Sequence, residues 1–139
     1  MMWKDSYKVG VELIDDQHKE LFRRLSEFFK VIRGDGSWED RMAKVKETLE
    51  FMQEYVIIHF HDEETYQEEI GFPDLENHKF IHEKFKKEIS DCAKTFEAGE
   101  MDEDKMQEFG GKLMTWLIMH VGKADQQIGE YARAKEGQA

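Results

Sequence analysis

The stretch "HKFIH" at residues 78–82 contains two histidines four positions apart. In a helix, this spacing places both rings on one side, one turn apart. Leu75 and Phe85 share that side and are apolar. Two polar rings therefore interrupt a stripe that would otherwise face a helical core, and the interruption needs a chemical reason.

The composition indicates one all-α domain spanning residues 1–139. Charged residues make up 37% of the chain, which has ten Phe and eight Met but only one Pro. This profile favours helices over a β-sandwich or an α/β fold. The formal net charge of −11 argues against nucleic acid and an anionic membrane surface as partners, because phosphate groups would be repelled.

Cysteine usage and hydropathy predict a cytoplasmic protein. Cys92 is the only cysteine, so no internal disulfide can form and a reducing compartment is expected. No apolar run approaches the roughly 20 residues that a membrane span needs, and the start of the chain lacks the apolar stretch of a signal peptide. Cys92 lies on an apolar helix stripe, where we expect it to be inert packing.

Three turn-rich breaks divide the chain: "RGDGS" (33–37), "IGFPDLE" (70–76) and "EAGEMDED" (97–104). Ser37 and Asp74 are expected N-caps, and Gly99 suits a helix C-cap. The breaks predict four helices, at about 14–33, 37–69, 74–98 and 102–134.

Each predicted helix carries apolar residues at alternating spacings of three and four, which is typical of a bundle helix facing a shared core. Met114 and Met119 in the last helix are expected to fill that core. Short connections favour antiparallel neighbours. We therefore predict an up-down-up-down four-helix bundle with an N-terminal extended segment.

Polar residues interrupt all four stripes. In such a bundle, early positions of odd helices meet late positions of even helices at one end, so these residues should converge. His61 lies about 200° around its helix from His59 and should face outward. The converging residues are five of the six histidines and two acids: His18, His59, Glu63, His78, His82, His120 and Asp125.

A metal centre explains this convergence best. A single buried histidine is usually satisfied by a hydrogen bond and needs no metal. Burying seven polar groups without strong compensation would cost several kcal/mol each. Folded proteins have a total stability of only about 5–15 kcal/mol. Neutral imidazoles and ionised carboxylates are metal ligands, so bound metal provides the compensation.

The donor set points to a pair of iron ions, with manganese as the less favoured alternative. Seven ligands exceed the roughly four that one zinc ion takes. Calcium and magnesium prefer oxygen, whereas this set is rich in nitrogen. The ferritin-like di-iron bundles carry Glu three residues before His, and no histidine here has that neighbour.

Four motifs occur in order: "IDDQH" (14–18), "HFHDEE" (59–64), "HKFIH" (78–82) and "WLIMHVGKAD" (116–125). A "W-x-x-x-Y-x-V-G-V" segment (3–11) precedes them. With these motifs the chain resembles the hemerythrin family, specifically its single-domain bacterial members. The resemblance implies that one iron is bound by three histidines and the other by two. The first set is His78, His82 and His120, and the second is His18 and His59.

In the family, the two irons cycle between Fe2+ and Fe3+ and share an oxo or hydroxo bridge. The resemblance implies that Glu63 and Asp125 also bridge them. Two octahedral ions offer twelve positions, of which these ligands fill eleven. The open position lies on the iron with two histidines, and dioxygen would bind there.

The resemblance implies reversible dioxygen binding for carriage, storage or delivery, rather than an enzyme. An oxygen- or redox-sensing module of a signalling protein, a di-iron peroxidase or oxidase, and a nitric-oxide-handling protein remain alternatives. An oxygen-using enzyme or a signalling domain is the expected partner.

In the family, residues at four matching positions line the oxygen pocket. Ordinary core packing explains these residues equally well. They are Leu21, Phe60, Trp116 and Leu117.

Overall fold

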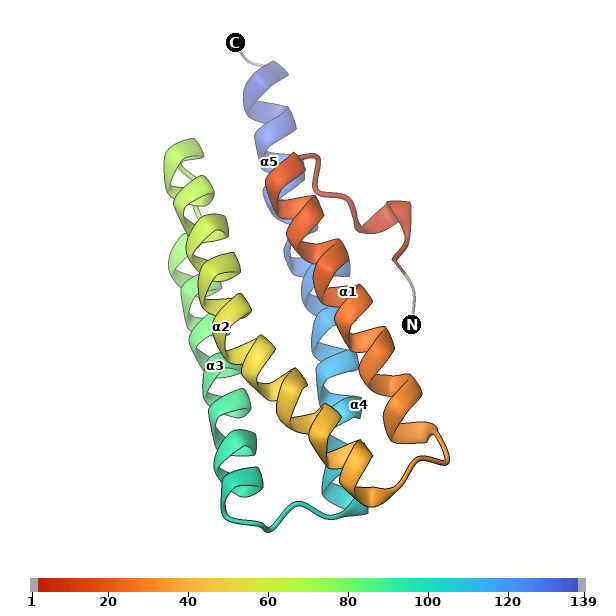
Figure 1. The fold of residues 1–139 in the computed structure, drawn as a ribbon. Coiled ribbons are helices and arrows are strands. Elements are labelled where there is room, and N and C mark those ends of the chain that lie inside the picture. The colour runs from red at the N-terminus through yellow and green to blue at the C-terminus, as the bar shows by residue number, and fades with distance from the viewer. Residues whose placement is uncertain (1–2, 138–139) are drawn as a thin grey trace.

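Four helical rods of alternating direction form the protein in a computed structural model that describes residues 3–137 (Figure 1). Helix α2 packs against α1 and α3, and α1 also packs against α4. The predicted all-α, up-down-up-down bundle is confirmed. The first three rods are single helices: α1 (Glu12–Arg33), α2 (Trp38–Ile70) and α3 (Leu75–Glu97).

The fourth rod differs from the uninterrupted helix expected over 102–134. It consists of α4 (Glu103–Met119), a π-helical turn η2 (His120–Ala124) and α5 (Gln126–Gly137). The backbone N–H of Asp125 donates to the carbonyl of His120, 2.8 Å away, which is the i→i+5 bond of a π-helix. The extent of the rod was predicted well, but its wide turn was not.

The predicted cap residues stand at the helix ends. The Ser37 hydroxyl accepts a hydrogen bond from the backbone N–H of Asp40 (3.1 Å) at the start of α2. Gly99 follows α3 with a φ of +73°, a left-handed conformation that favours glycine. Asp74 occupies the N-cap position of α3, but its carboxylate accepts from the Asn77 side chain instead of a backbone N–H.

The apolar core forms two clusters at different levels of the bundle. The larger includes Phe28 and Met52, and the smaller joins Ile14 to Phe72 and Ile128. In α1, His18 lies between Ile14 of the smaller cluster and Leu21 of the larger one, and in the fourth rod His120 and Asp125 lie between Leu117 and Ile128 in the same way. The polar groups therefore form a layer enclosed by apolar side chains above and below.

Two further expectations on the fourth rod have different outcomes. Met114 is partly buried and packs against the larger cluster, as expected. The expectation for Met119 was wrong, because its side chain is 48% exposed. Met119 directly precedes the buried His120, and one residue of helix turns a side chain by about 100°, here toward solvent.

The N-terminal segment contacts both the first and the last helix of the chain, α1 and α5. It is not wholly extended, because Asp5–Tyr7 forms one turn of 3-10 helix, η1. The buried carboxylate of Asp15 accepts hydrogen bonds from the backbone N–H groups of Val9 (2.7 Å) and Gly10 (3.1 Å). Gly129 of α5 lies directly against Val9, where an added Cβ would be 2.2 Å from the Val9 carbonyl oxygen.

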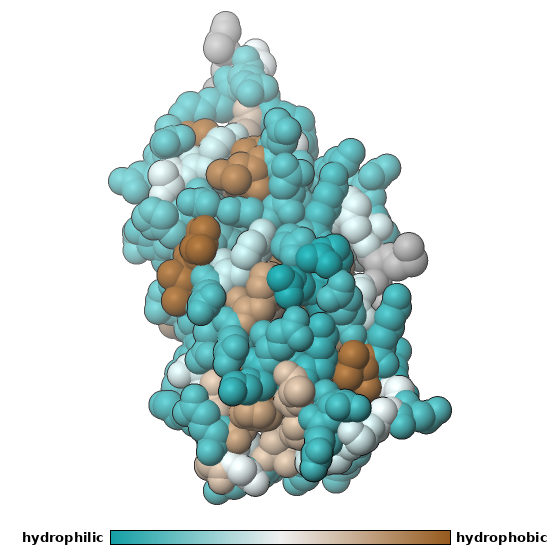
Figure 2. Space-filling model, viewed as in Figure 1, coloured by the Kyte–Doolittle hydropathy of each residue, from teal (hydrophilic) through white to brown (hydrophobic). Residues whose placement is uncertain are grey.

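The outer surface is mainly hydrophilic on the face shown in Figure 2, with apolar side chains in separate spots. Among the described residues, no helix combines the length and the hydropathy that a membrane crossing requires.

Packing at Gly129 can be tested by substitution. We expect Gly129→Ala to lower the free energy of unfolding by about 1–3 kcal/mol, since the new methyl group displaces the N-terminal segment. Gly111→Ala is the matched control, because Gly111 is an exposed helical glycine with open space around it. It should raise stability by about 0.5–1 kcal/mol. Denaturant titrations followed by circular dichroism measure both, and equal effects would contradict the packing.

The reactivity of Cys92 provides a second test. Cys92 lines a cavity of about 240 Å³ between α3 and α4, and burial raises the pKa of its thiol to about 11. The reactive thiolate is therefore scarce at pH 8 and increases only as the pH approaches 11. We expect iodoacetamide to alkylate Cys92 at pH 8 at least about tenfold more slowly than free cysteine. Equal rates would show that the thiol is not protected.

Candidate metal centre

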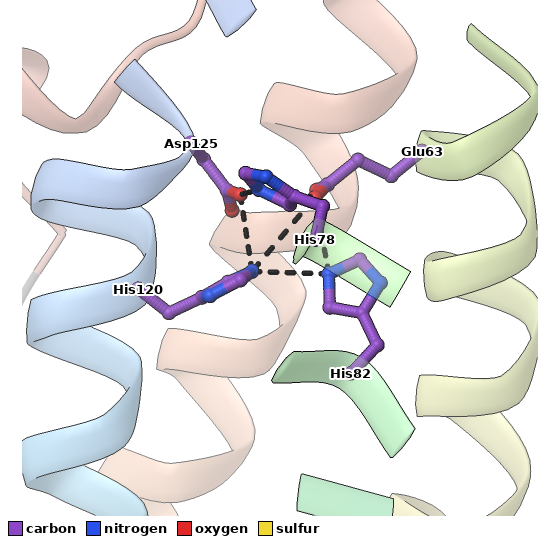
Figure 3. Close-up of side chains that lie close together, drawn as sticks. All are labelled: Glu63, His78, His82, His120 and Asp125. Carbon is purple, nitrogen blue, oxygen red and sulfur yellow. Dashed lines mark hydrogen bonds and ion pairs between the residues drawn. The ribbon is translucent and has the colours of Figure 1, made fainter. Parts of the chain in front are cut away.

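The seven residues predicted as ligands all meet in the polar layer, and none is more than 4% exposed. Figure 3 shows five of them pointing toward one another from three rods. His61, in contrast, is exposed, as predicted from its place on the helix. The converging residues are His18 of α1, His59 and Glu63 of α2, His78 and His82 of α3, His120 of η2, and Asp125.

The two carboxylate oxygens of Glu63 face different histidines. Oε2 lies 3.3 Å from the Nε2 atoms of both His18 and His59. Oε1 lies 3.3 Å from Nε2 of His82, and it also faces His78 at 3.7 Å and His120 at 3.8 Å. Glu63 therefore stands between a pair and a triplet of imidazoles.

Asp125 divides its oxygens in the same way. Oδ1 lies 2.9 Å from Nε2 of His78 and 3.0 Å from Nε2 of His120, whereas Oδ2 lies 3.1 Å from Nε2 of His18. Two sets of ligand atoms result, each with all members within 4.8 Å of one another. One set contains the three histidines with both acids, and the other contains His18 and His59 with Glu63.

These donor atoms fit metal ions better than they fit one another. Both Glu63 oxygens, Nε2 of His18 and Oδ2 of Asp125 are buried, and their close contacts lack hydrogen-bond geometry. Buried polar atoms without hydrogen-bond partners are rare in native proteins. All five imidazoles direct Nε2 toward the carboxylates. Nitrogen and carboxylate donors gathered in this way suit iron among the first-row metals.

Local helix geometry explains the spacings of the ligands. His59 with Glu63, and His78 with His82, are four residues apart, so an α-helix stacks each pair on one face. His120 and Asp125 are five apart, which in an α-helix would separate them by about 140°. The π-turn returns the chain to the same side after five residues, so that both side chains enter the layer.

Gln17 fixes the tautomer of His59, and sequence analysis missed this role. The Gln17 Nε2 group donates to Asp62 (2.8 Å), so its Oε1 faces Nδ1 of His59 at 2.7 Å. Because Oε1 can only accept, Nδ1 must carry the hydrogen and Nε2 keeps a free lone pair toward the layer. Gln17 precedes His18 in the sequence, but only the packing of α1 on α2 reveals its partner.

Glu64 has the same role at His82 that Gln17 has at His59, and sequence analysis missed this role too. Its Oε2 accepts from Nδ1 of His82 at 2.7 Å, which leaves Nε2 of His82 free as a ligand. Glu64 follows Glu63 directly and lies about 100° further around α2. The sequence signal is therefore a second acid beside a candidate ligand, which is too common on exposed helix faces to be specific.

The four predicted pocket residues are apolar neighbours of the layer. Phe60 stacks on the His82 ring, with centroids 3.8 Å apart, and Trp116 stacks on the His120 ring at 4.3 Å. Leu21, Phe60 and Leu117 are at most 1% exposed, and Trp116 packs against the same core cluster. Aromatic side chains therefore cover two of the ligand rings. The role of the four residues in an oxygen pocket stays a prediction.

Opposite charges face each other within the layer. Burial would lower the pKa of His18 and His120, but Asp125 and Glu63 outweigh it and raise these pKa values to about 9 and about 10. Burial likewise raises the pKa of Glu63 and Asp125, but the surrounding histidines prevail and hold both below their usual range. Burial dominates at His59 and lowers its pKa. The two acids therefore stay ionised, and a metal ion binding in the layer would displace the protons of His18 and His120.

The fold and the layer together define a class of protein, a four-helix bundle with a buried, histidine-rich metal centre. The Hemerythrin HHE cation binding domain matches residues 9–132. The chain belongs to the hemerythrin family.

Curated relatives and solved structures agree with this assignment. The bacteriohemerythrin of Clostridium acetobutylicum is 28% identical, with 91% of this chain and 96% of that protein covered. The bacteriohemerythrin of Pseudomonas paraeruginosa is 33% identical, with coverages of 90% and 76%. The crystal structure of a wild-type hemerythrin superposes with a TM-score of 0.77 at 27% identity, covering 94% of this chain and 95% of that one.

Metal analysis of two variants tests the ligand assignment. We expect purified protein to contain about two iron ions per chain, one for each set of ligand atoms. Glu63→Ala should lose most of this iron, because Glu63 belongs to both sets. His61→Ala on the exposed face of the same helix should retain it. Equal iron contents in the two variants, or one zinc ion in the unmodified protein, would contradict the assignment.

Proposed function

We propose that the protein binds dioxygen reversibly at a pair of iron ions in the polar layer. The observation that carries this proposal is the division of the Glu63 and Asp125 oxygens between two sets of imidazoles. One carboxylate shared between two sets of nitrogen donors is an arrangement that suits a pair of metal ions. Membership of the hemerythrin family supports the choice of iron.

The residues divide into two halves in this proposal. His78, His82 and His120 hold one ion, and His18 and His59 hold the other. Both acids would serve both ions, and an oxo or hydroxo group would complete their ligands. The half with two histidines has one protein ligand fewer, so it would be the half that takes up dioxygen.

Iron supplies an exchangeable coordination position and a one-electron change between Fe2+ and Fe3+. The chain keeps every imidazole Nε2 directed at the layer and both acids ionised. It also limits the access of water, since Phe60 and Leu117, which lie beside the ligands in the larger apolar cluster, are at most 1% exposed. A dry, apolar site slows side reactions of a bound oxygen species, including its loss by protonation.

We propose carriage, storage or delivery of dioxygen in preference to catalysis. Leu21 and Leu117 lie one helical turn from His18 and His120, and neither can donate a proton to reduced oxygen. An oxygen-using enzyme is the partner that fits delivery. Sensing within a signalling protein, peroxidase activity and nitric-oxide handling remain alternatives, and a cytoplasmic location stays a prediction.

A reversible spectrum distinguishes carriage from these alternatives. We expect the anaerobically reduced, iron-loaded protein to gain visible absorbance in air and to lose it when oxygen is removed, over repeated cycles. Permanent oxidation in the first cycle would contradict a carrier and favour a sensor or an enzyme. Steady turnover with hydrogen peroxide and a reductant would favour the enzyme.

A further inference from the structure

The two halves of the metal centre have outer hydrogen-bond partners of different charge. On the half with two histidines, Nδ1 of His59 faces the neutral amide oxygen of Gln17. On the half with three, Nδ1 of His82 faces the carboxylate of Glu64. Both distances are 2.7 Å, so the partners differ in charge and not in reach.

The charge of the outer partner changes what the imidazole gives to a metal. An acceptor that carries a negative charge draws the Nδ1 proton more strongly and makes Nε2 a better electron donor. A better donor stabilises the more highly charged ion, Fe3+, over Fe2+. The Glu64 carboxylate adds its own electrostatic attraction in the same direction.

The charge of Asp62, the acid next to Gln17, does not cancel this difference. Asp62 contacts Gln17 and not a ligand histidine, so its charge reaches His59 only through an intervening amide. The Glu64 side chain is 21% exposed, so solvent screens part of its charge but leaves its direct hydrogen bond intact. The difference in charge between the two halves therefore comes from Gln17, which contacts His59, and Glu64, which contacts His82.

We propose that Glu64 is a positioning residue that acts through His82 to lower the reduction potential of the three-histidine half. It favours the ferric state there and so sets how readily the centre oxidises in air. This inference rests on the proposed di-iron site and goes beyond it, because it assigns redox tuning to a residue outside the ligand set.

Redox titration of the iron-loaded Glu64→Gln variant tests the proposal. The amide keeps an acceptor for Nδ1 of His82 and removes only the charge. In the titration, each Fe3+ takes up one electron from dithionite through a mediator dye, and no atom is transferred. We expect unchanged iron content, a reduction potential shifted in the positive direction, and slower conversion of the reduced protein to the ferric form in air.

Asp62→Asn is the matched control. It removes one negative charge two residues away on the same helix, and its amide oxygen can still accept from Gln17. We expect its shift in potential to be much smaller than that of Glu64→Gln. No shift in Glu64→Gln, or equal shifts in the two variants, would overturn the proposal. Loss of iron from Glu64→Gln would also overturn it, since Glu64 would then serve metal retention.

A second measurement avoids iron redox chemistry altogether. In the protein loaded with diamagnetic Zn2+, the proton on Nδ1 of His82 should resonate far downfield because it lies in a hydrogen bond to a carboxylate. Glu64→Gln should move this resonance upfield, and Asp62→Asn should leave it in place. An unmoved resonance in Glu64→Gln would contradict the hydrogen bond itself. Both tests remain informative if dioxygen binding proves irreversible, because neither measures it.

Discussion

The division of two carboxylates between two groups of imidazoles is the constraint on which the rest of the structure depends. Glu63 and Asp125 are each completely buried, and each directs one oxygen to His18 and the other to the histidines of α3 and η2. Such a layer is too costly to bury on hydrogen bonds alone, because several of its atoms have none. Two cations held between these groups would satisfy the donors and neutralise the acids.

The remainder of the fold serves to hold that layer in place. Apolar clusters enclose it on both sides, and the N-terminal segment packs against α1 and α5 through Asp15 and Gly129. The π-turn departs from regular α-helix geometry, and His120 and Asp125 share a face because of it. Outside the layer, Gln17 and Glu64 orient two rings, one through a neutral amide and the other through a carboxylate.

Sequence reasoning reached the bundle and six of the seven converging residues because both follow from periodicity, whereas Asp125, five residues after His120, was only placed close to the same face. A stripe such as Leu75, His78, His82 and Phe85 reports which side chains face the core, whatever the neighbouring helix is. Features that depend on a second helix escaped it, including the partners of Gln17 and Glu64. The π-turn escaped for another reason: a spacing of five suggests it only after both residues are known to face the layer. Which iron each residue binds remains a proposal.

Anomalous diffraction from crystals of the iron-loaded protein, collected at the iron absorption edge, tests the central claim most directly. The account predicts two iron peaks in the layer, with Glu63 and Asp125 each contributing one oxygen to each peak. A single peak, or peaks away from these two acids, would contradict it.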